Sequence, residues 1–341
     1  SQTLPSHTSL FTGLSPREHG IESNISWLNG SYIPSPKIRL LASVLAEQGY
    51  ATAGMISAMP LERGSGVEVG FQTWVQPEQK NVRGDVTVEA ALEWLAEAPE
   101  EPWFLWVHLF DPHHPYNAPE EFRRFAPSEE QRRHLTALGI PEVVSPKPPK
   151  QIAVGPMHDR YDAEVLFSDF QVRRLLSGVR EAGAWPRTAV VVTSDHGEGL
   201  WQHGIRDHST IWNEQLEVPL IVRVPGVKAR RVESRMTGRD ILPTLLGLLP
   251  GIDGTELLAQ SSGVDVLAAD FEAPPRYTIV PPMPLLREQE ERSFLYEHAL
   301  EHAGWRLVVG EEGRVELYDI EADPHELVNL AEAEPERLAK M

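Results

Sequence analysis

Apolar runs alternate along this chain with segments in which apolar positions recur at helical spacing. The strand-like runs are residues 50–56, 103–109, 188–193 and 218–224. The helix-like segments are residues 38–48, 86–98, 161–182 and 241–249. Strands separated by helices in this order predict an α/β fold, in which helices cover both faces of a mostly parallel central sheet.

Two segments interrupt the alternation. Residues 125–156 contain prolines at 127, 141, 146, 148, 149 and 156, so we expect a long surface excursion that cannot be regular throughout. The second is residues 251–275. Beyond it, short runs at 277–280, 294–297, 305–309 and 315–318 predict a small antiparallel sheet. We therefore predict a catalytic domain of residues 1–270 and a C-terminal α+β subdomain of residues 271–341.

Composition excludes several classes of protein. The 31 basic and 50 acidic residues give a net charge of -19, which disfavours binding to nucleic acid or to an anionic membrane. With no cysteine, the chain cannot hold a disulfide, a zinc-thiolate site or a cysteine nucleophile. No apolar run approaches the ~20 residues of a membrane span. Because the chain opens on serine without a signal segment, we expect it to start inside a longer protein, and its localisation stays open.

The strongest local signal is the segment Thr193–Gly199, which directly follows a buried strand-like run. Loops at the carboxyl ends of parallel strands form the ligand crevice of α/β proteins, so Asp195 and His196 are candidate metal ligands. The alternative is that Asp195 caps a helix and His196 bonds a backbone group. Nearby imidazoles at His203 and His208 favour a functional loop.

Two further segments carry candidate side chains. In Thr3–Gly13, a hydroxyl and an imidazole precede an apolar stretch, which fits either a nucleophile at a helix start or simply a capped helix. The strand-like run 103–109 leads into a proline-braced loop. There His113 is a candidate catalytic residue, whereas we expect His108 to be a buried strand residue.

Together these segments resemble the sulfatase family of the alkaline phosphatase superfamily. Thr3–His7 and Thr12–Gly13 lie where such proteins carry Cys/Ser-x-Pro-Ser-Arg and Thr-Gly. Further blocks in family order are residues 45–53, 111–116, 194–199, 218–221, 240–245 and 317–326. The resemblance covers nearly the full chain and implies an alkaline-phosphatase-like sandwich.

The resemblance also implies roles for individual residues. Thr3 takes the nucleophile position, and Asp195 and His196 take two metal-ligand positions. His113 takes the place of a histidine that contacts the substrate or protonates the leaving group. The family's arginine is replaced by His7, which we count as a further catalytic candidate.

Substrate and metal contacts follow from the same resemblance. His203 and His208 lie in the region where sulfatases often hold a substrate lysine, so they are candidate substrate-binding residues. One or two divalent ions are implied: calcium by the sulfatases, manganese or zinc by the phosphatases. An imidazole ligand disfavours calcium. The family's N-terminal aspartates have no counterpart here, so the metal-binding strand is expected to precede residue 1.

The residue at the nucleophile position affects the expected chemistry. Sulfatases with formylglycine make it from Cys or Ser, whereas Thr3 could yield only a ketone and must act through its own hydroxyl. This favours phosphate or phosphonate esters, although the family indicates sulfate. We therefore expect metal-dependent hydrolysis of a sulfuric or phosphoric ester on a small molecule, glycan or lipid. The alternatives are a phosphoethanolamine or glycerophosphate transferase and a degenerate, non-catalytic binding protein.

Overall fold

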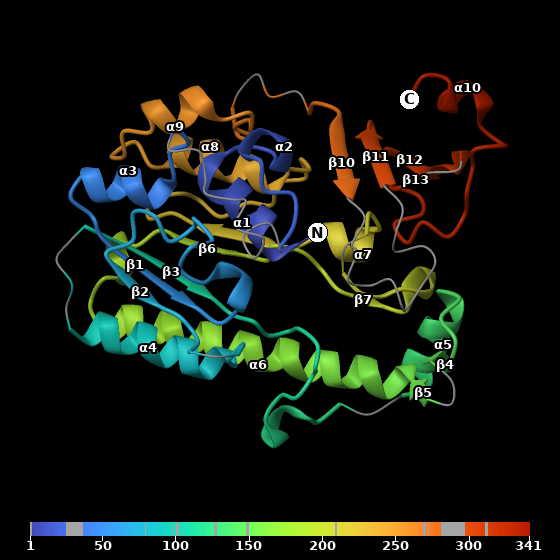
Figure 1. Cartoon of the computed structure of the whole chain (residues 1–341), viewed down its shortest axis with the longest axis horizontal. Helices are drawn as coiled ribbons and strands as arrows, with labels where there is room; N and C mark the ends of the chain where they lie inside the picture. The colour runs from blue at the N-terminus through green and yellow to red at the C-terminus, as the bar shows by residue number, and fades with distance from the viewer. Residues whose placement is uncertain are drawn as a thin grey trace.

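A three-stranded parallel sheet forms the centre of the fold (Figure 1). Its strands, in the order β2-β1-β3, are β1 (Ala51–Ile56), β2 (Thr73–Val75) and β3 (Trp103–His108). The computed structural model describes residues 2–24, 37–78, 80–97, 99, 102–125, 128–147, 150–208, 210–268, 271, 273–280, 297–310 and 313–341. The predicted α/β fold is confirmed.

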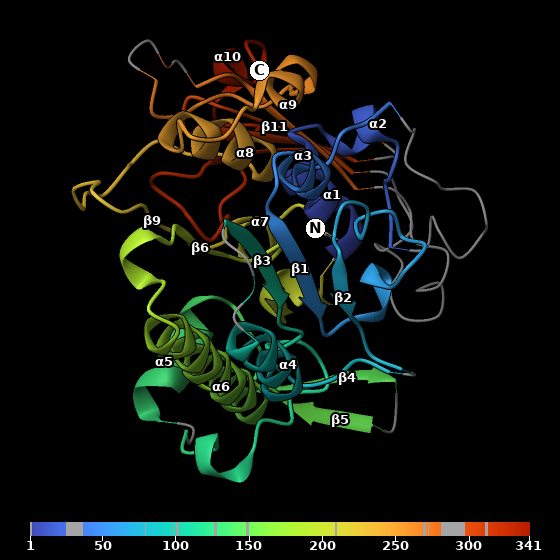
Figure 2. The same ribbon diagram turned by 90° about the vertical axis from the view of Figure 1, so that its left-hand side faces the viewer.

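One strand, β9 (Leu220–Arg223), runs antiparallel to its neighbour. β6 (Val190–Thr193) lies beside β3 in both views (Figures 1 and 2) and pairs antiparallel with β9. The helix between them, α7 (Asn213–Leu216), has only four residues. The connection also contains two short strands, β7 (Gly199–Leu200) and β8 (Arg206–Asp207), and it returns to the same edge, so β9 starts at the end where β6 finishes.

Helices cover both faces of the sheet, as Figure 2 shows. The helices on one side are α1 (Thr3–Thr12), α2 (Pro16–His19), α3 (Leu41–Glu47), α8 (Gly238–Leu248) and α9 (Thr255–Gln260). The helices on the other side are α4 (Gly84–Ala96) and α6 (Val154–Glu181).

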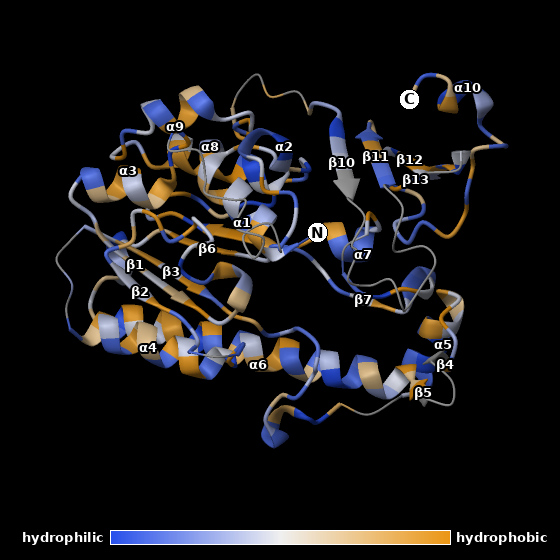
Figure 3. Ribbon diagram, in the orientation of Figure 1, coloured by the Kyte–Doolittle hydropathy of each residue, from blue (hydrophilic) through white to orange (hydrophobic). Residues whose placement is uncertain are grey.

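Alternate residues of β3 point to opposite faces of the sheet. Phe104 and Trp106 pack into the core around Phe11 of α1, whereas Leu105 packs with Ala91 of α4. Such two-residue alternation is the pleat of a strand with both faces covered. Figure 3 shows hydrophobic colour in the central region, most clearly at β6, whereas two strands of the C-terminal sheet carry hydrophilic stretches.

The proline-rich excursion contains more regular structure than expected. It holds α5 (Glu129–Ala137), where the Ser128 hydroxyl accepts a hydrogen bond from the Gln131 N–H at 3.0 Å, and a hairpin of β4 (Val143–Lys147) and β5 (Lys150–Ala153). The predicted helix 161–182 also begins earlier, at Val154. Pro156 is tolerated because N–H groups of a first helical turn have no intrahelical partner.

The C-terminal residues form the expected antiparallel sheet. Its strands, in the order β10-β11-β12-β13, are β10 (Arg276–Val280), β11 (Glu297–His302), β12 (Trp305–Gly310) and β13 (Val315–Asp319), and α10 (Pro335–Leu338) follows. Of the predicted run 294–297, only residue 297 lies within the described residues. The division into two domains at residue 270 stays a prediction. In the described ranges, every helix is too short or too polar to span a bilayer.

A buried glutamate in α6 gives the fold a testable pH dependence. Glu164 is 1% exposed, and burial together with the neighbouring Asp111 carboxyl raises its pKa from 4.5 to about 8. Protonated Glu164 therefore stabilises the fold fully below pH 4.5, and this contribution is lost as the pH rises through about 8.

We expect Glu164→Gln to remove this dependence. The Tm of the unmodified protein, measured relative to that of the variant, should fall by at least about 3 °C between about pH 5 and about pH 8. Thermal unfolding at pH values from about 5 to about 8 measures this difference in Tm. Glu121→Gln, at an exposed glutamate, is the matched control. A Tm difference that stays constant with pH would contradict the assignment.

Candidate active site

The carboxyl ends of β1, β3 and β6 meet at a small cavity. Its volume is about 70 Å³. Its lining residues are Thr3, Ala58, His108, Leu109, Phe110, Asp111, Pro112, His113, Tyr161, Ser194, Asp195, His196, Gly197 and Glu198. This is the edge at which open α/β sheets bind ligands. Four of the predicted site residues, Thr3, His113, Asp195 and His196, line this one cavity.

Thr3 is the first residue of α1. The N-cap position belongs to Gln2, whose side chain makes no capping bond, so Thr3 does not cap the helix. Thr3 is 8% exposed and lines the cavity. The amino end of a helix favours an anion, because its N–H groups and macrodipole are positive there.

Asp195 and His196 lie on the loop after β6. The Asp195 Oδ2 and His196 Nε2 atoms are 3.4 Å apart, and His196 Nδ1 donates to the Gly197 carbonyl at 2.8 Å. A Cβ on Gly197 would lie 2.0 Å from the Glu214 carbonyl oxygen, so the close backbone approach predicted at this glycine is present. Burial opposes the charge on Asp195, yet the neighbouring imidazoles of His196 and His7 outweigh it and lower the pKa of Asp195.

Three histidines, two of which line the cavity, are packed next to one another. His113 Nε2 lies 3.3 Å from His208 Nε2, and the His208 ring stacks on His196 with centroids 4.0 Å apart. His113 also stacks on Phe110 at 4.3 Å and bonds the His114 carbonyl through Nδ1. Since a carbonyl only accepts, Nδ1 of His113 carries a proton. The fold thus brings His113, His196 and His208 together.

His203 lies apart from these three histidines. Its ring stacks on Trp212 with centroids 4.0 Å apart, and its Nε2 is 3.8 Å from Glu214 Oε2. It is not among the residues that line the cavity. Its substrate-binding role stays a prediction, without support from this placement.

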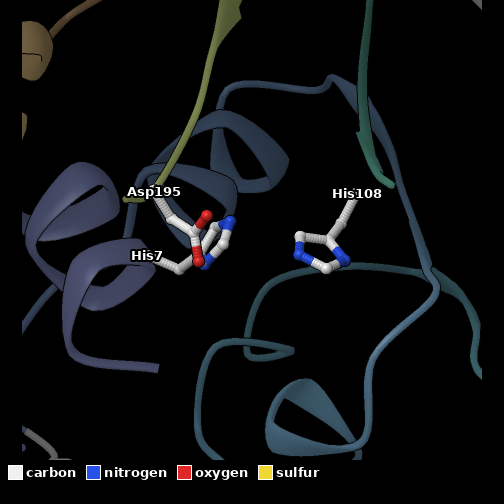
Figure 4. A group of neighbouring side chains, drawn as sticks. All are labelled: His7, His108 and Asp195. Carbon is white, nitrogen blue, oxygen red and sulfur yellow. The ribbon is translucent and has the colours of Figure 1, made fainter. Parts of the chain in front are cut away.

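His7 and His108 face Asp195 from two other elements (Figure 4). His7, on α1, is 7% exposed and places Nδ1 3.8 Å from Asp195 Oδ2. His108 ends β3 and is 8% exposed, so it is the buried strand residue expected from sequence. Burial lowers the pKa of His108 to about 3, so its imidazole is neutral.

A divalent metal fits these donors. Ligand atoms of His7, His108 and Asp195 lie within 4.8 Å of one another, as do those of a second group, His196, Glu198 and His208. The Nδ1 atom of His108 is buried with no hydrogen-bond partner among the described residues. Imidazole and carboxylate together suit zinc or another borderline ion better than calcium.

Glu198 was not assigned a role from sequence, although it belongs to the Asp195 motif. It is 6% exposed and accepts a hydrogen bond from the Tyr116 hydroxyl at 2.7 Å. Burial raises the pKa of Glu198 to about 7. A carboxyl so perturbed in a cavity wall is a functional candidate.

Comparison with known proteins gives one consistent result. The family model described as Sulfatase matches residues 1–252. A choline-sulfatase of Rhizobium meliloti is 27% identical over 256 residues, which cover 68% of this chain and 46% of that protein. The chain spans about half the length of this and the other first relatives it matches.

Solved structures share the fold. A 2-O GAG sulfatase superposes with a TM-score of 0.74 at 19% identity, covering 99% of this chain and 80% of that one. The phosphonate monoester hydrolase of Agrobacterium radiobacter superposes with a TM-score of 0.71 at 20% identity, covering 97% and 82%.

Proposed function

Because the chain belongs to the sulfatase family, we propose that it is a metal-dependent hydrolase of sulfuric or phosphoric esters whose nucleophile is the Thr3 hydroxyl. One observation carries the proposal: Thr3 lines the same cavity as Asp195, His196 and His113. A hydroxyl, metal donors and a candidate acid around one small space are the parts that this chemistry needs.

The residues divide the reaction between them. Thr3 Oγ1 attacks the sulfur or phosphorus, its proton passes to water, and the bond to the leaving oxygen breaks. His113 gives that oxygen a proton, so an alcohol departs and the transferred group stays on Thr3. Water then attacks the sulfur or phosphorus, which releases the inorganic anion and restores the hydroxyl.

Asp195 and His196 are the proposed metal ligands. A divalent ion held there would polarise the ester oxygens and favour ionisation of a nearby hydroxyl. The helix amino end at Thr3 adds positive potential on the same side.

The ester class follows from the Thr3 side chain. A sulfated or phosphorylated threonine must be cleaved by water, because no aldehyde hydrate is available to eliminate the group. We therefore propose phosphate or phosphonate monoesters as the better substrates, with the anion carried by a small molecule or glycan. Initial rates on matched nitrophenyl sulfate, phosphate monoester, phosphate diester and phosphonate test this, and a clear preference for the sulfate would overturn it.

We expect His113→Ala to slow alkyl esters far more than aryl esters. A general acid contributes about 10²- to 10⁴-fold, and the benefit falls as the leaving group becomes more acidic. The measurement is kcat/KM for an alkyl and a nitrophenyl ester of the same anion. His134→Ala, an exposed histidine on α5, is the matched control. Equal losses on the two esters would show that His113 only positions the substrate.

A further inference from the structure

We propose that His7, His108 and Asp195 form a two-histidine, one-carboxylate site that binds one zinc-class divalent ion. The inference deepens the proposed function by naming the class of ion and by adding His7 and His108 to Asp195, the ligand that both proposals share. It rests on the proposed function in one respect: the ion bound here would be the ion that the proposed hydrolysis uses.

The three ligands come from segments far apart in the chain. His7 lies on α1, His108 at the end of β3 and Asp195 on the loop after β6, and their side chains converge (Figure 4). The His7 and His108 ring centroids are 5.0 Å apart. Zinc bonds of about 2.0–2.1 Å place tetrahedral ligand atoms roughly 3.4 Å apart. The three ligand atoms lie within 4.8 Å of one another, so on binding zinc they would need to move closer together by about 1 Å.

The surroundings of His7 prepare it as a ligand. Its Nδ1 donates a hydrogen bond to the Thr3 backbone carbonyl at 2.8 Å. That bond fixes the tautomer and leaves the lone pair on Nε2. A ligating histidine almost always donates its other ring N–H to a carbonyl, carboxylate or water. The His7 ring also packs on Trp106, with centroids 5.2 Å apart, which restricts its rotation.

His108 supplies an independent observation. Its side chain is more than nine-tenths buried and turned toward His7 and Asp195 (Figure 4), yet Nδ1 has no hydrogen-bond partner in the described part of the chain. Buried polar side chains are hydrogen-bonded in the large majority of cases. Figure 4 shows the other ring nitrogen, Nε2, on the side of Asp195, so an ion bound through Nε2 would give this buried imidazole a polar partner.

The charge of the cavity also favours an ion at this site. None of the described residues that line it is a lysine or an arginine. Two neutral imidazoles and one carboxylate would leave a divalent ion with a net positive charge, which an anionic ester needs opposite it. Calcium prefers all-oxygen shells, so this donor set selects zinc or cobalt instead.

Zinc titration of the full chain, after removal of metal by a chelator, tests the site. Calorimetry should find a tight zinc site that binds calcium at least about 100-fold more weakly. His7→Ala and His108→Ala should each weaken zinc binding at least about 100-fold, whereas His134→Ala should not. Zinc affinity unchanged in both variants would overturn the proposal.

A measurement on the unmodified protein removes the dependence on variant folding. Crystals soaked in zinc should show an anomalous scattering peak between His7, His108 and Asp195. A peak on Asp195 and His196 alone, or no peak in the cavity, would refute the site. Neither readout requires turnover. If zinc binds at this site but the protein cleaves no ester, the proposed function is wrong and the metal site is still supported.

Discussion

Thr3→Ala is expected to lower kcat on the best substrate by at least about 1,000-fold, because it removes the atom that forms the covalent bond. Thr3→Ser should retain appreciable activity, since it keeps the hydroxyl and loses only a methyl group. The measurement is steady-state kinetics on the preferred ester. Because Thr3 is the first helical residue and Gln2 the cap, the alanine variant should fold normally.

The same variant separates the nucleophile from the metal. Thr3→Ala should bind zinc like the unmodified protein, because its side chain is not a proposed ligand. Ser6→Ala is the matched control, a neighbouring hydroxyl on the same helix. A Thr3→Ala protein with normal turnover would move the nucleophile to water or to Ser6.

The second large effect is expected on stability, at Arg306. This arginine is 2% exposed, and its Nη1 donates to Glu326 Oε1 at 2.6 Å and its Nη2 to Glu301 Oε2 at 3.0 Å. Replacing it with leucine leaves the Glu326 carboxylate buried without its cationic partner. Breaking a buried pair in this way costs about 3–5 kcal/mol in free energy of unfolding. Denaturant titration measures that free energy.

Two further variants serve as controls for this prediction. Arg231→Leu removes an exposed pair with Glu233 and should change the free energy of unfolding by less than about 1 kcal/mol. Adding Glu326→Gln to Arg306→Leu should recover part of the loss, because the unpaired charge is removed. If Arg306→Leu were no more damaging than Arg231→Leu, the buried pair would not support the fold.

The Arg306 pair also matters for the site. Glu326 accepts a hydrogen bond from the Asn213 backbone N–H at 2.8 Å, at the start of α7. The Glu214 carbonyl of the same helix lies against Gly197 on the loop that carries Asp195. The C-terminal sheet is therefore joined through α7 to the loop that carries the candidate metal ligands.

Local patterns predicted most of the regular elements. The runs 50–56 and 103–109 are buried on both faces, so their apolar composition alone indicates strands, and β1 and β3 lie there. The direction of a strand could not be predicted in this way. β9 runs opposite to β6 because of how the connection folds, and no residue within 218–224 encodes that.

The site was predictable only in part, for a similar reason. Asp195, His196 and Thr3 belong to recognisable segments, and the topology of the sheet brings them together. His108 carries no motif, and its contact with His7 depends on which face of β3 turns toward α1. The period-two pattern of the strand cannot reveal this because both faces of β3 are apolar. His203 shows the converse, since closeness in sequence to Asp195 did not place it in the cavity.

The most direct test of the account is to look for the transferred group on the nucleophile. The full chain, loaded with metal, is mixed with its best ester, quenched in acid within the first turnovers and digested for peptide mass spectrometry. The account predicts a phosphate or sulfate on Thr3 that builds up and then decays as substrate is exhausted. The same group on Ser6, or an unmodified amino-terminal peptide while product forms, would contradict it.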